Sequence, residues 1–165
     1  AIEKTAKAVI GVRTKMETGE VLQGSGLIIT SDGLVVTLAD LVPQGAAFSF
    51  YINGSSTSYQ ILKRDLKENL ALIKIGEANL PTLSFANLEK IKLGERVFLV
   101  GARAVNEGII RRFDENLIET NISEDKTLAG SPLFNIEAEV LGLNTIQNGR
   151  VISIPVSKIK DFIGF

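Results

Sequence analysis

The 165-residue chain contains neither cysteine nor histidine, and each absence excludes a class of chemistry. Without cysteine there are no disulfides and no thiolate nucleophile. Without histidine there is no imidazole to act as a general base near neutral pH, and metal sites built on histidine or cysteine ligands are excluded. The acidic residues are not grouped at ligand spacing either. We therefore expect no metal and no other cofactor.

An excess of basic residues and long apolar runs are also missing. The net charge is -1, so the chain lacks the basic footprint of a domain that binds nucleic acid or anionic membranes. No apolar run reaches the roughly 18 residues of a membrane span, which predicts no direct membrane insertion. Because the first residue is Ala1 and not methionine, we expect a piece of a longer protein, without its targeting segment.

The chain is instead rich in short β-like segments separated by turn residues, and 45% of its residues are hydrophobic. Such spacing is typical of a β-barrel or sandwich and not of βαβ units. The predicted strands form two sets of six: Ala8–Arg13, Val21–Thr30, Leu34–Thr37, Ala47–Ile52, Ser58–Lys63 and Ala71–Ile75, then Arg96–Gly101, Gly108–Phe113, Leu117–Ile122, Leu133–Asn135, Val140–Asn144 and Val151–Ile154.

The order of these segments predicts an all-β chain with two six-stranded antiparallel β-barrels and a short C-terminal helix. We place the N-terminal barrel at residues 8–78, a linker at 79–94, the C-terminal barrel at 95–155 and the helix at 157–163. Ser157 is the expected N-cap of this helix, with Ile159, Phe162 and Ile163 on its apolar face.

Five sequence motifs identify a family. The first, Gly24–Thr37, reads GSGLIITSDGLVVT, and the others are Asp65–Ile75, Thr120–Asn135, Glu139–Thr145 and Ile154–Pro155. In this order and spacing they resemble the HtrA/Deg branch of the trypsin-like serine proteases, nearly end to end. The resemblance implies the trypsin-like double-barrel fold over residues 1–165.

The residues that the family uses for catalysis are replaced. In the register of these motifs, Asp40 stands at the position of the catalytic histidine, Asn69 at that of the aspartate and Ala129 at that of the nucleophilic serine. Thr127 stands where the family has a glycine whose backbone N–H helps to form the oxyanion hole. Because the mechanism needs all of these groups, the resemblance implies a pseudoprotease that has lost its activity.

Three further interpretations remain at this stage. Asp40 and Asn69 are expected to lie within hydrogen-bond reach of each other and to form a satisfied polar pair between the barrels. Relocated catalysis, with Lys126 activating Ser131 or with Asp40 as an acid, would make the domain a hydrolase of another kind. A purely architectural domain would have no ligand in its cleft.

The favoured interpretation is a protein-interaction or scaffold domain whose old substrate cleft binds extended peptides by β-pairing. Its partner would be a protein or peptide, and no nucleic acid. The resemblance further implies an extracytoplasmic place, or a membrane anchor through a missing segment. The candidate peptide-binding residues are Thr127, Leu128, Leu143, Asn144, Thr145 and Ile146.

Overall fold

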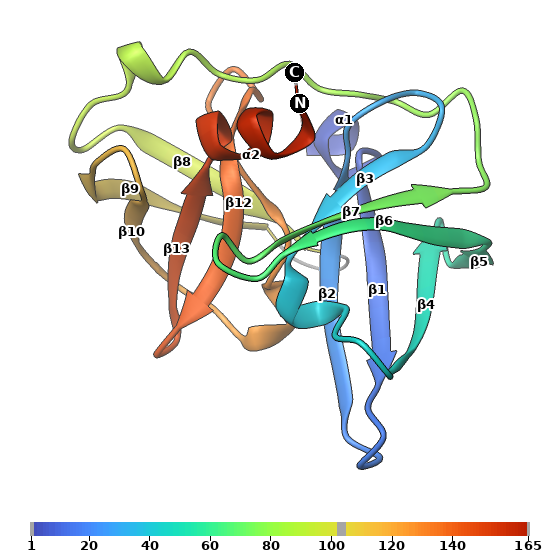
Figure 1. Cartoon of the computed structure of the whole chain (residues 1–165). Coiled ribbons are helices and arrows are strands. Elements are labelled where there is room, and N and C mark those ends of the chain that lie inside the picture. Colours follow the sequence, from blue (N-terminus) through green and yellow to red (C-terminus); the bar gives the residue numbers. More distant parts are fainter. Residues whose placement is uncertain (1, 102–104, 165) are drawn as a thin grey trace.

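The computed structural model describes residues 2–101 and 105–164. Its N-terminal half is one antiparallel sheet of strand order β5-β4-β1-β2-β3-β7-β6. A 3-10 turn, η1 (Ala39–Leu41), follows β3 and lies near the middle of the molecule (Figure 1). After helix α1 (Ile2–Ala6), the strands of this sheet are β1 (Val9–Lys15), β2 (Val21–Ile28), β3 (Leu34–Thr37), β4 (Ala47–Ile52), β5 (Ser55–Thr57), β6 (Tyr59–Asp65) and β7 (Leu70–Ile75).

This sheet differs from the predicted six-stranded barrel in having a seventh strand and no closing backbone ladder among the described residues. The extra strand is β5, which forms a hairpin with β4 through Asn53 and Gly54, both at positive φ. That turn type allows pairing to restart at once, where the sequence indicated only a loop. Side chains connect the edge strand β6 to β4, the neighbour of the other edge strand. The Tyr59 ring of β6 lies 4.9 Å from that of Phe50 and 6.1 Å from that of Phe48, between ring centroids.

The C-terminal half is a closed barrel of strand order β10-β13-β12-β11-β8-β9, as predicted. Two more 3-10 turns, η2 (Leu88–Lys90) and η3 (Lys126–Leu128), precede β8 and β11. Turn η3 contributes Lys126 and Thr127 to the candidate site described below. The six strands are β8 (Arg96–Val100), β9 (Val105–Phe113), β10 (Ile118–Ser123), β11 (Pro132–Asn135), β12 (Val140–Gln147) and β13 (Arg150–Pro155).

The C-terminal helix α2 (Val156–Ile163) lies beside the barrel, with Val156, Ile159 and Phe162 buried. The expected cap at Ser157 is wrong, because the helix begins one residue earlier and Pro155 occupies the N-cap position without a side-chain cap. Proline provides a fixed φ and has no N–H to satisfy, so it ends β13 and starts the helix directly. Among the described residues, no helix is long and apolar enough to cross a membrane.

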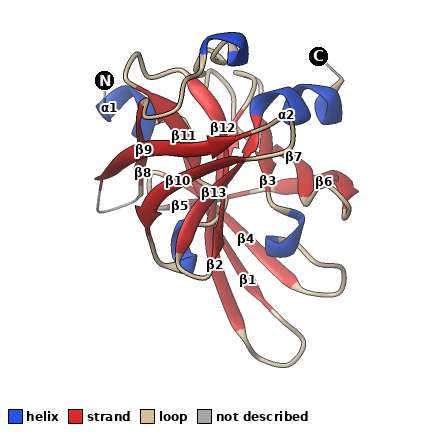
Figure 2. Ribbon diagram, turned by 90° about the vertical axis from the view of Figure 1, so that its left-hand side faces the viewer, coloured by secondary structure: helices blue, strands red, loops and turns tan. Residues whose placement is uncertain are grey.

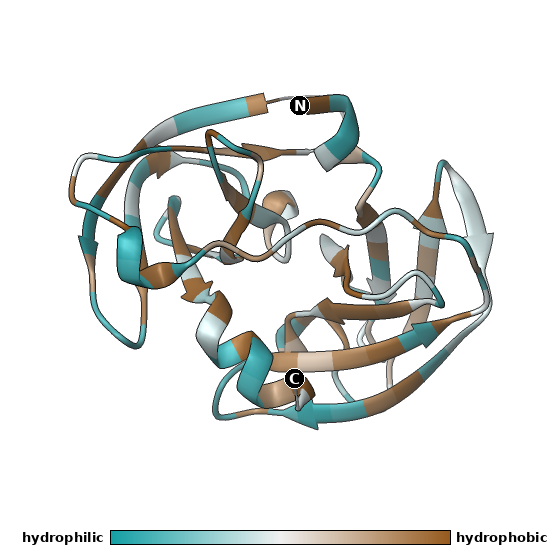
Figure 3. Cartoon of the chain, turned by 90° about the horizontal axis from the view of Figure 1, so that it is seen from above, coloured by the Kyte–Doolittle hydropathy of each residue, from teal (hydrophilic) through white to brown (hydrophobic). Residues whose placement is uncertain are grey.

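The described residues form two hydrophobic cores, one of which spans both halves. One fills the C-terminal barrel around Leu99, Leu133 and Leu141. The other starts inside the N-terminal sheet and continues across the interface to Leu143 and α2, so the halves share one packed core. The segment between β7 and β8 crosses the top of the molecule from one half to the other (Figures 1 and 3).

Candidate functional site

The three positions that the motif register aligns with the family's catalytic residues line one cleft. This cleft, of about 920 Å³, lies where the N-terminal sheet meets the C-terminal barrel. Strands β1 and β2, turns η1 and η3, and the end of β12 all contribute to it. Figures 1 and 2 show the β1–β2 hairpin projecting beyond the rest of its sheet. The lining residues are Arg13, Glu20, Val21, Leu22, Gln23, Leu38, Asp40, Leu41, Asn69, Lys126, Thr127, Ala129, Thr145, Ile146 and Gln147.

Asp40 and Asn69 form the expected hydrogen-bonded pair. The backbone N–H of Asp40 donates to Oδ1 of Asn69 at 2.9 Å, and Nδ2 of Asn69 donates to the Asp40 carboxylate at 3.1 Å. The carbonyl of Asn69 also accepts from the N–H of Ala39 at 3.1 Å. Asn69 has a φ of 58°, a left-handed conformation that asparagine tolerates better than most residues. The loop before β7 therefore fixes the position of η1 and of its carboxylate.

In the loop that contains Ala129, the backbone N–H groups of Thr127 and Ala129 are both engaged in hydrogen bonds. The N–H of Ala129 donates to the carbonyl of Lys126 at 3.0 Å, which closes η3. The N–H of Thr127 donates to the side chain of Asp125 at 3.1 Å. An oxyanion hole needs free N–H groups aimed at one point. At the two positions that correspond to those donors, both groups bond within their own turn.

The same loop joins the two halves. The N–H of Ser25 on β2 donates to the carbonyl of Ala129 at 2.8 Å. A Cβ at Gly24 would lie 2.4 Å from Cδ1 of Leu41 and 2.7 Å from the Ala129 oxygen. A Cβ at Gly130, which has a φ of 85°, would lie 2.0 Å from the Ser25 oxygen. Only glycines permit so close a contact between β2 and the loop.

Ser131 belongs to a buried polar network. Its hydroxyl donates to the carbonyl of Leu128 at 2.6 Å and accepts from Nδ2 of Asn144 at 3.1 Å. The Asn144 oxygen accepts in turn from the hydroxyl of Ser153. Ser131 and Asn144 are completely buried. Because Lys126 lines the cleft and is not among these partners, the structure gives Ser131 a structural role and does not form the imagined Ser-Lys pair.

Of the six candidate peptide-binding residues, Thr127, Thr145 and Ile146 line the cleft. The expectation for the side chains of Leu143 and Asn144 needs correction, because both are completely buried. Leu128 packs against the C-terminal core and is not a lining residue. Position along β12 explains the difference for the strand residues. The first five residues of β12 are buried, and the strand leaves the core only after Asn144, one residue beyond the end of its pairing with β11.

The sequence analysis missed the opposite wall, formed by β1 and β2. Val21 to Gln23 of β2 pair with β1 on one side, whereas β3 reaches β2 only at Leu27 and Ile28. On β12, pairing with β11 ends at Leu143, although β13 pairs as far as Gln147. Within the part of the chain that is described, residues 21–23 and 145–147 thus each have one edge without a partner strand.

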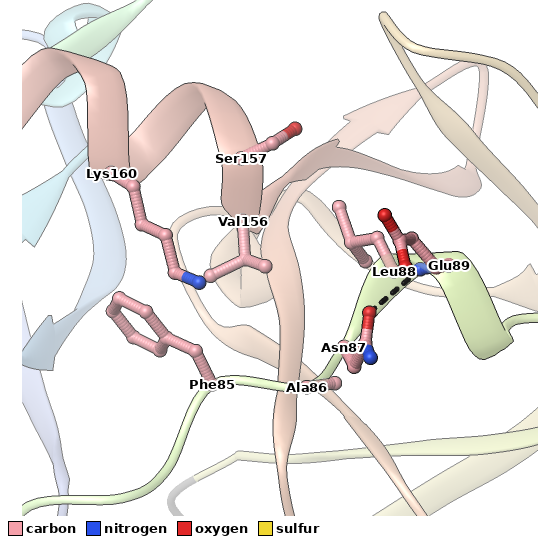
Figure 4. A pocket seen from close by; sticks show the side chains of 8 residues that line it. All are labelled: Phe85, Ala86, Asn87, Leu88, Glu89, Val156, Ser157 and Lys160. Atoms are coloured by element: carbon pink, nitrogen blue, oxygen red, sulfur yellow. Dashed lines mark hydrogen bonds between the residues drawn. The ribbon is translucent and has the colours of Figure 1, made fainter.

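A second hollow of about 320 Å³ lies between the linker and the start of α2 (Figure 4). Nζ of Lys160 lies 5.7 Å from the ring centroid of Phe85, a cation–π contact. The side chain of Asn87 accepts from the N–H of Glu89 and so stabilises η2. None of the candidate site residues lines this hollow. The described residues contain no group of acidic side chains that could hold a metal ion.

Comparison with known proteins identifies the family of the chain. A family model described as a trypsin-like peptidase domain matches residues 24–143, more than half of the chain. The chain belongs to the trypsin-like peptidase family. The matched region runs from the Gly24-Ser25-Gly26 strand to β12, and so contains the three positions that the motif register assigns to the triad. The family that the motifs indicated is thereby confirmed.

Relatives within this family include HtrA and DegP-like proteases. A probable periplasmic serine endoprotease DegP-like of Halomonas elongata is 31% identical over 136 residues, which cover 74% of this chain and 29% of the relative. A protein of the same description from Rhizobium meliloti is 30% identical over 163 residues, with 86% and 32% covered. Serine protease HTRA1A of Danio rerio is 31% identical over 190 residues, with 98% and 40% covered. The chain spans at most 40% of the length of these three relatives.

Proposed function

We propose that this trypsin-like peptidase domain is catalytically inactive and works as a protein-interaction domain that binds extended peptide segments in its cleft without cutting them. The observation that carries the proposal is the content of the cleft. Asp40, Asn69 and Ala129 line it together, and the chain offers no histidine. Strands of both halves line the cleft, but the residues at the positions assigned to the triad differ from those of an active enzyme.

Inactivity follows from what acyl transfer requires. The reaction needs a nucleophile, a base that accepts its proton and donors that stabilise the oxyanion. Alanine has no hydroxyl, and the carboxylate of Asp40 is hydrogen-bonded to an amide instead of a serine. The N–H groups of Thr127 and Ala129 are bonded within η3. Loss of the triad alone costs about a million-fold in turnover.

Peptide binding is supported by the two unpartnered strand edges of the cleft. An extended segment that lies along residues 145–147 of β12 or 21–23 of β2 would complete backbone hydrogen bonds that are otherwise left to water. Val21, Leu22 and Ile146 supply apolar contact along these edges. Main-chain pairing gives little sequence selectivity, so we expect dissociation constants of about micromolar order or weaker.

The surroundings of the domain form part of the proposal. Relatives described as periplasmic support an extracytoplasmic place for this chain as well. The domain would there belong to a larger protein, held at a membrane or in the envelope through a segment outside these 165 residues. Its partner would be a protein or peptide and not a nucleic acid, since the net charge of -1 provides no basic surface of the required strength.

Two measurements test the proposal separately. Incubation with a fluorophosphonate probe and with casein, beside an active HtrA protease as the positive control, should give no labelled serine and no cleavage. Labelling of any serine of the domain would refute inactivity. Chemical-shift mapping with a library of extended peptides should give shifts at Thr145–Gln147 and Val21–Gln23. Shifts confined to a remote face, or none at millimolar peptide, would favour the architectural role.

A further inference from the structure

Asp40 is an oriented carboxylate that lines the cleft. It lies in η1 and is exposed to solvent, and Asn69 holds both its backbone N–H and one of its carboxylate oxygens. A neutral amide orients the carboxylate but leaves its charge in place. Turn η1 contacts β1, β2 and β7, and Asp40 and Leu41 of this turn line the cleft. The charge is therefore presented to whatever occupies the cleft.

The carboxylate of Asp40 has no counter-ion among the residues that the structure describes. The three ion pairs found there join Arg96 to Glu107, Arg112 to Glu119 and Lys158 to Glu68, all outside the cleft. Arg13, Lys126 and Glu20 also line the cleft, yet neither cation lies within 4.0 Å of Asp40. Asp40 is thus an oriented carboxylate that forms no direct ion pair with a cation of the cleft.

We propose that Asp40 binds the cationic side chain of a lysine or arginine in the bound peptide and so sets the specificity of the cleft. The inference rests on the proposed peptide binding and adds the class of ligand. Beside Asp40 stand Leu38 and Leu41, whose apolar atoms would contact the methylene stem of such a side chain. An aspartate or glutamate in the same place would meet like charge.

The expected preference is modest because Asp40 is exposed. An ion pair that remains in contact with water typically changes affinity by about fivefold or less. Because Asn69 already orients the Asp40 carboxylate, this side chain loses less conformational freedom when a peptide binds. We therefore expect an affinity difference of about fivefold. Screening should weaken the preference as salt rises, since the Debye length falls from about 30 Å at 0.01 M to about 3 Å at 1 M.

The test uses terminally blocked, neutral aliphatic nonapeptides in which a single lysine is moved from position to position. Matched peptides carry norleucine or glutamate at the same position, and fluorescence anisotropy gives their dissociation constants. At one position the lysine peptide should bind about fivefold more tightly than the norleucine peptide, and the glutamate peptide more weakly. D40N should abolish this difference, because the amide keeps the partner of Asn69 but loses the charge.

Two control variants locate the effect. D161N removes the same charge from the exposed face of α2, outside the cleft, and should leave the lysine preference unchanged. E20Q removes the other carboxylate of the cleft, and loss of the preference in that variant alone would overturn the assignment to Asp40. Equal affinity of all peptides for the parent would refute the specificity and leave the groove. Absence of any binding at millimolar peptide would refute both.

Discussion

Replacing Asn69 by aspartate tests whether the Asp40–Asn69 pair matters for stability. The variant would place a second carboxylate where Nδ2 now lies 3.1 Å from the Asp40 oxygen, so one hydrogen bond is lost and a repulsion replaces it. Two unit charges about 4 Å apart repel by about 1 kcal/mol in water and about 4 kcal/mol at an effective dielectric constant of 20. Because Asp40 is exposed, we take the lower half of this range and expect a loss of about 1–2 kcal/mol at pH 7.

Thermal unfolding measures this loss directly. For a domain of this size, 1 kcal/mol corresponds to roughly 2–4 °C in Tm, so N69D should melt roughly 2–8 °C below the parent at pH 7. The pKa of the introduced carboxyl would lie above its unfolded value of about 3.9 because the folded state disfavours its charge. The penalty is therefore full above the folded pKa and disappears as the pH falls below about 3.9.

Two controls separate the repulsion from other effects. N69G tolerates the φ of 58° and removes both side-chain hydrogen bonds without adding a charge, so its lower stability should not depend on pH in the same way. The exchange variant D40N/N69D restores one carboxylate facing one amide and should recover most of the loss. Equal melting temperatures of parent and N69D at pH 7, or no recovery in the exchange variant, would refute the reasoning.

Two further predictions concern the loop around Ala129. The triple variant D40H/N69D/A129S should stay at least about 100-fold below an active HtrA protease in turnover, because the N–H groups of Thr127 and Ala129 are bonded within η3; turnover within tenfold of that enzyme would contradict this. G24A should destabilise the domain by about 1–3 kcal/mol in denaturant titration, because its Cβ would overlap Leu41 and the Ala129 oxygen. The control G11A, whose Cβ would lie 3.7 Å from Tyr51, should leave stability unchanged. Equal stabilities of the two variants would show that the Ala129 loop can move away from the added methyl group.

Much of the fold was predictable because its signals are local. Strand alternation and turn residues gave the C-terminal barrel strand by strand, and the apolar spacing of Ile159 and Phe162 gave the buried face of α2. The seventh strand was not predicted, because Ser55–Thr57 has no hydrophobic pattern and pairs only through the Asn53-Gly54 turn. Its place on the sheet depends on the register of β4, which a composition pattern does not contain.

The sequence motifs predicted which residues meet in the candidate site, but not which strands form the walls around them. Motif register alone paired Asp40 with Asn69, 29 residues apart, and the structure has that hydrogen bond. The wall formed by Val21–Gln23 carries no motif of its own, since its part in the cleft arises from where β3 stops pairing with β2. Burial of Leu143 likewise depends on the packing of two sheets, which the spacing of residues within β12 does not specify.

The glycine motifs explain why the chain is recognisable as a member of its family whatever residues stand at the positions assigned to the triad. Gly24 and Gly130 are needed because β2 and the Ala129 loop touch through backbone atoms, and Ser131 is needed because its hydroxyl joins the network of Asn144 and Ser153. These contacts hold the two halves together and do not depend on a nucleophile or a base. Substitution at the triad positions therefore changes the chemistry of the cleft and leaves its walls in place. The proposed binding of peptides without cleavage depends on these walls and not on the side chains at the triad positions.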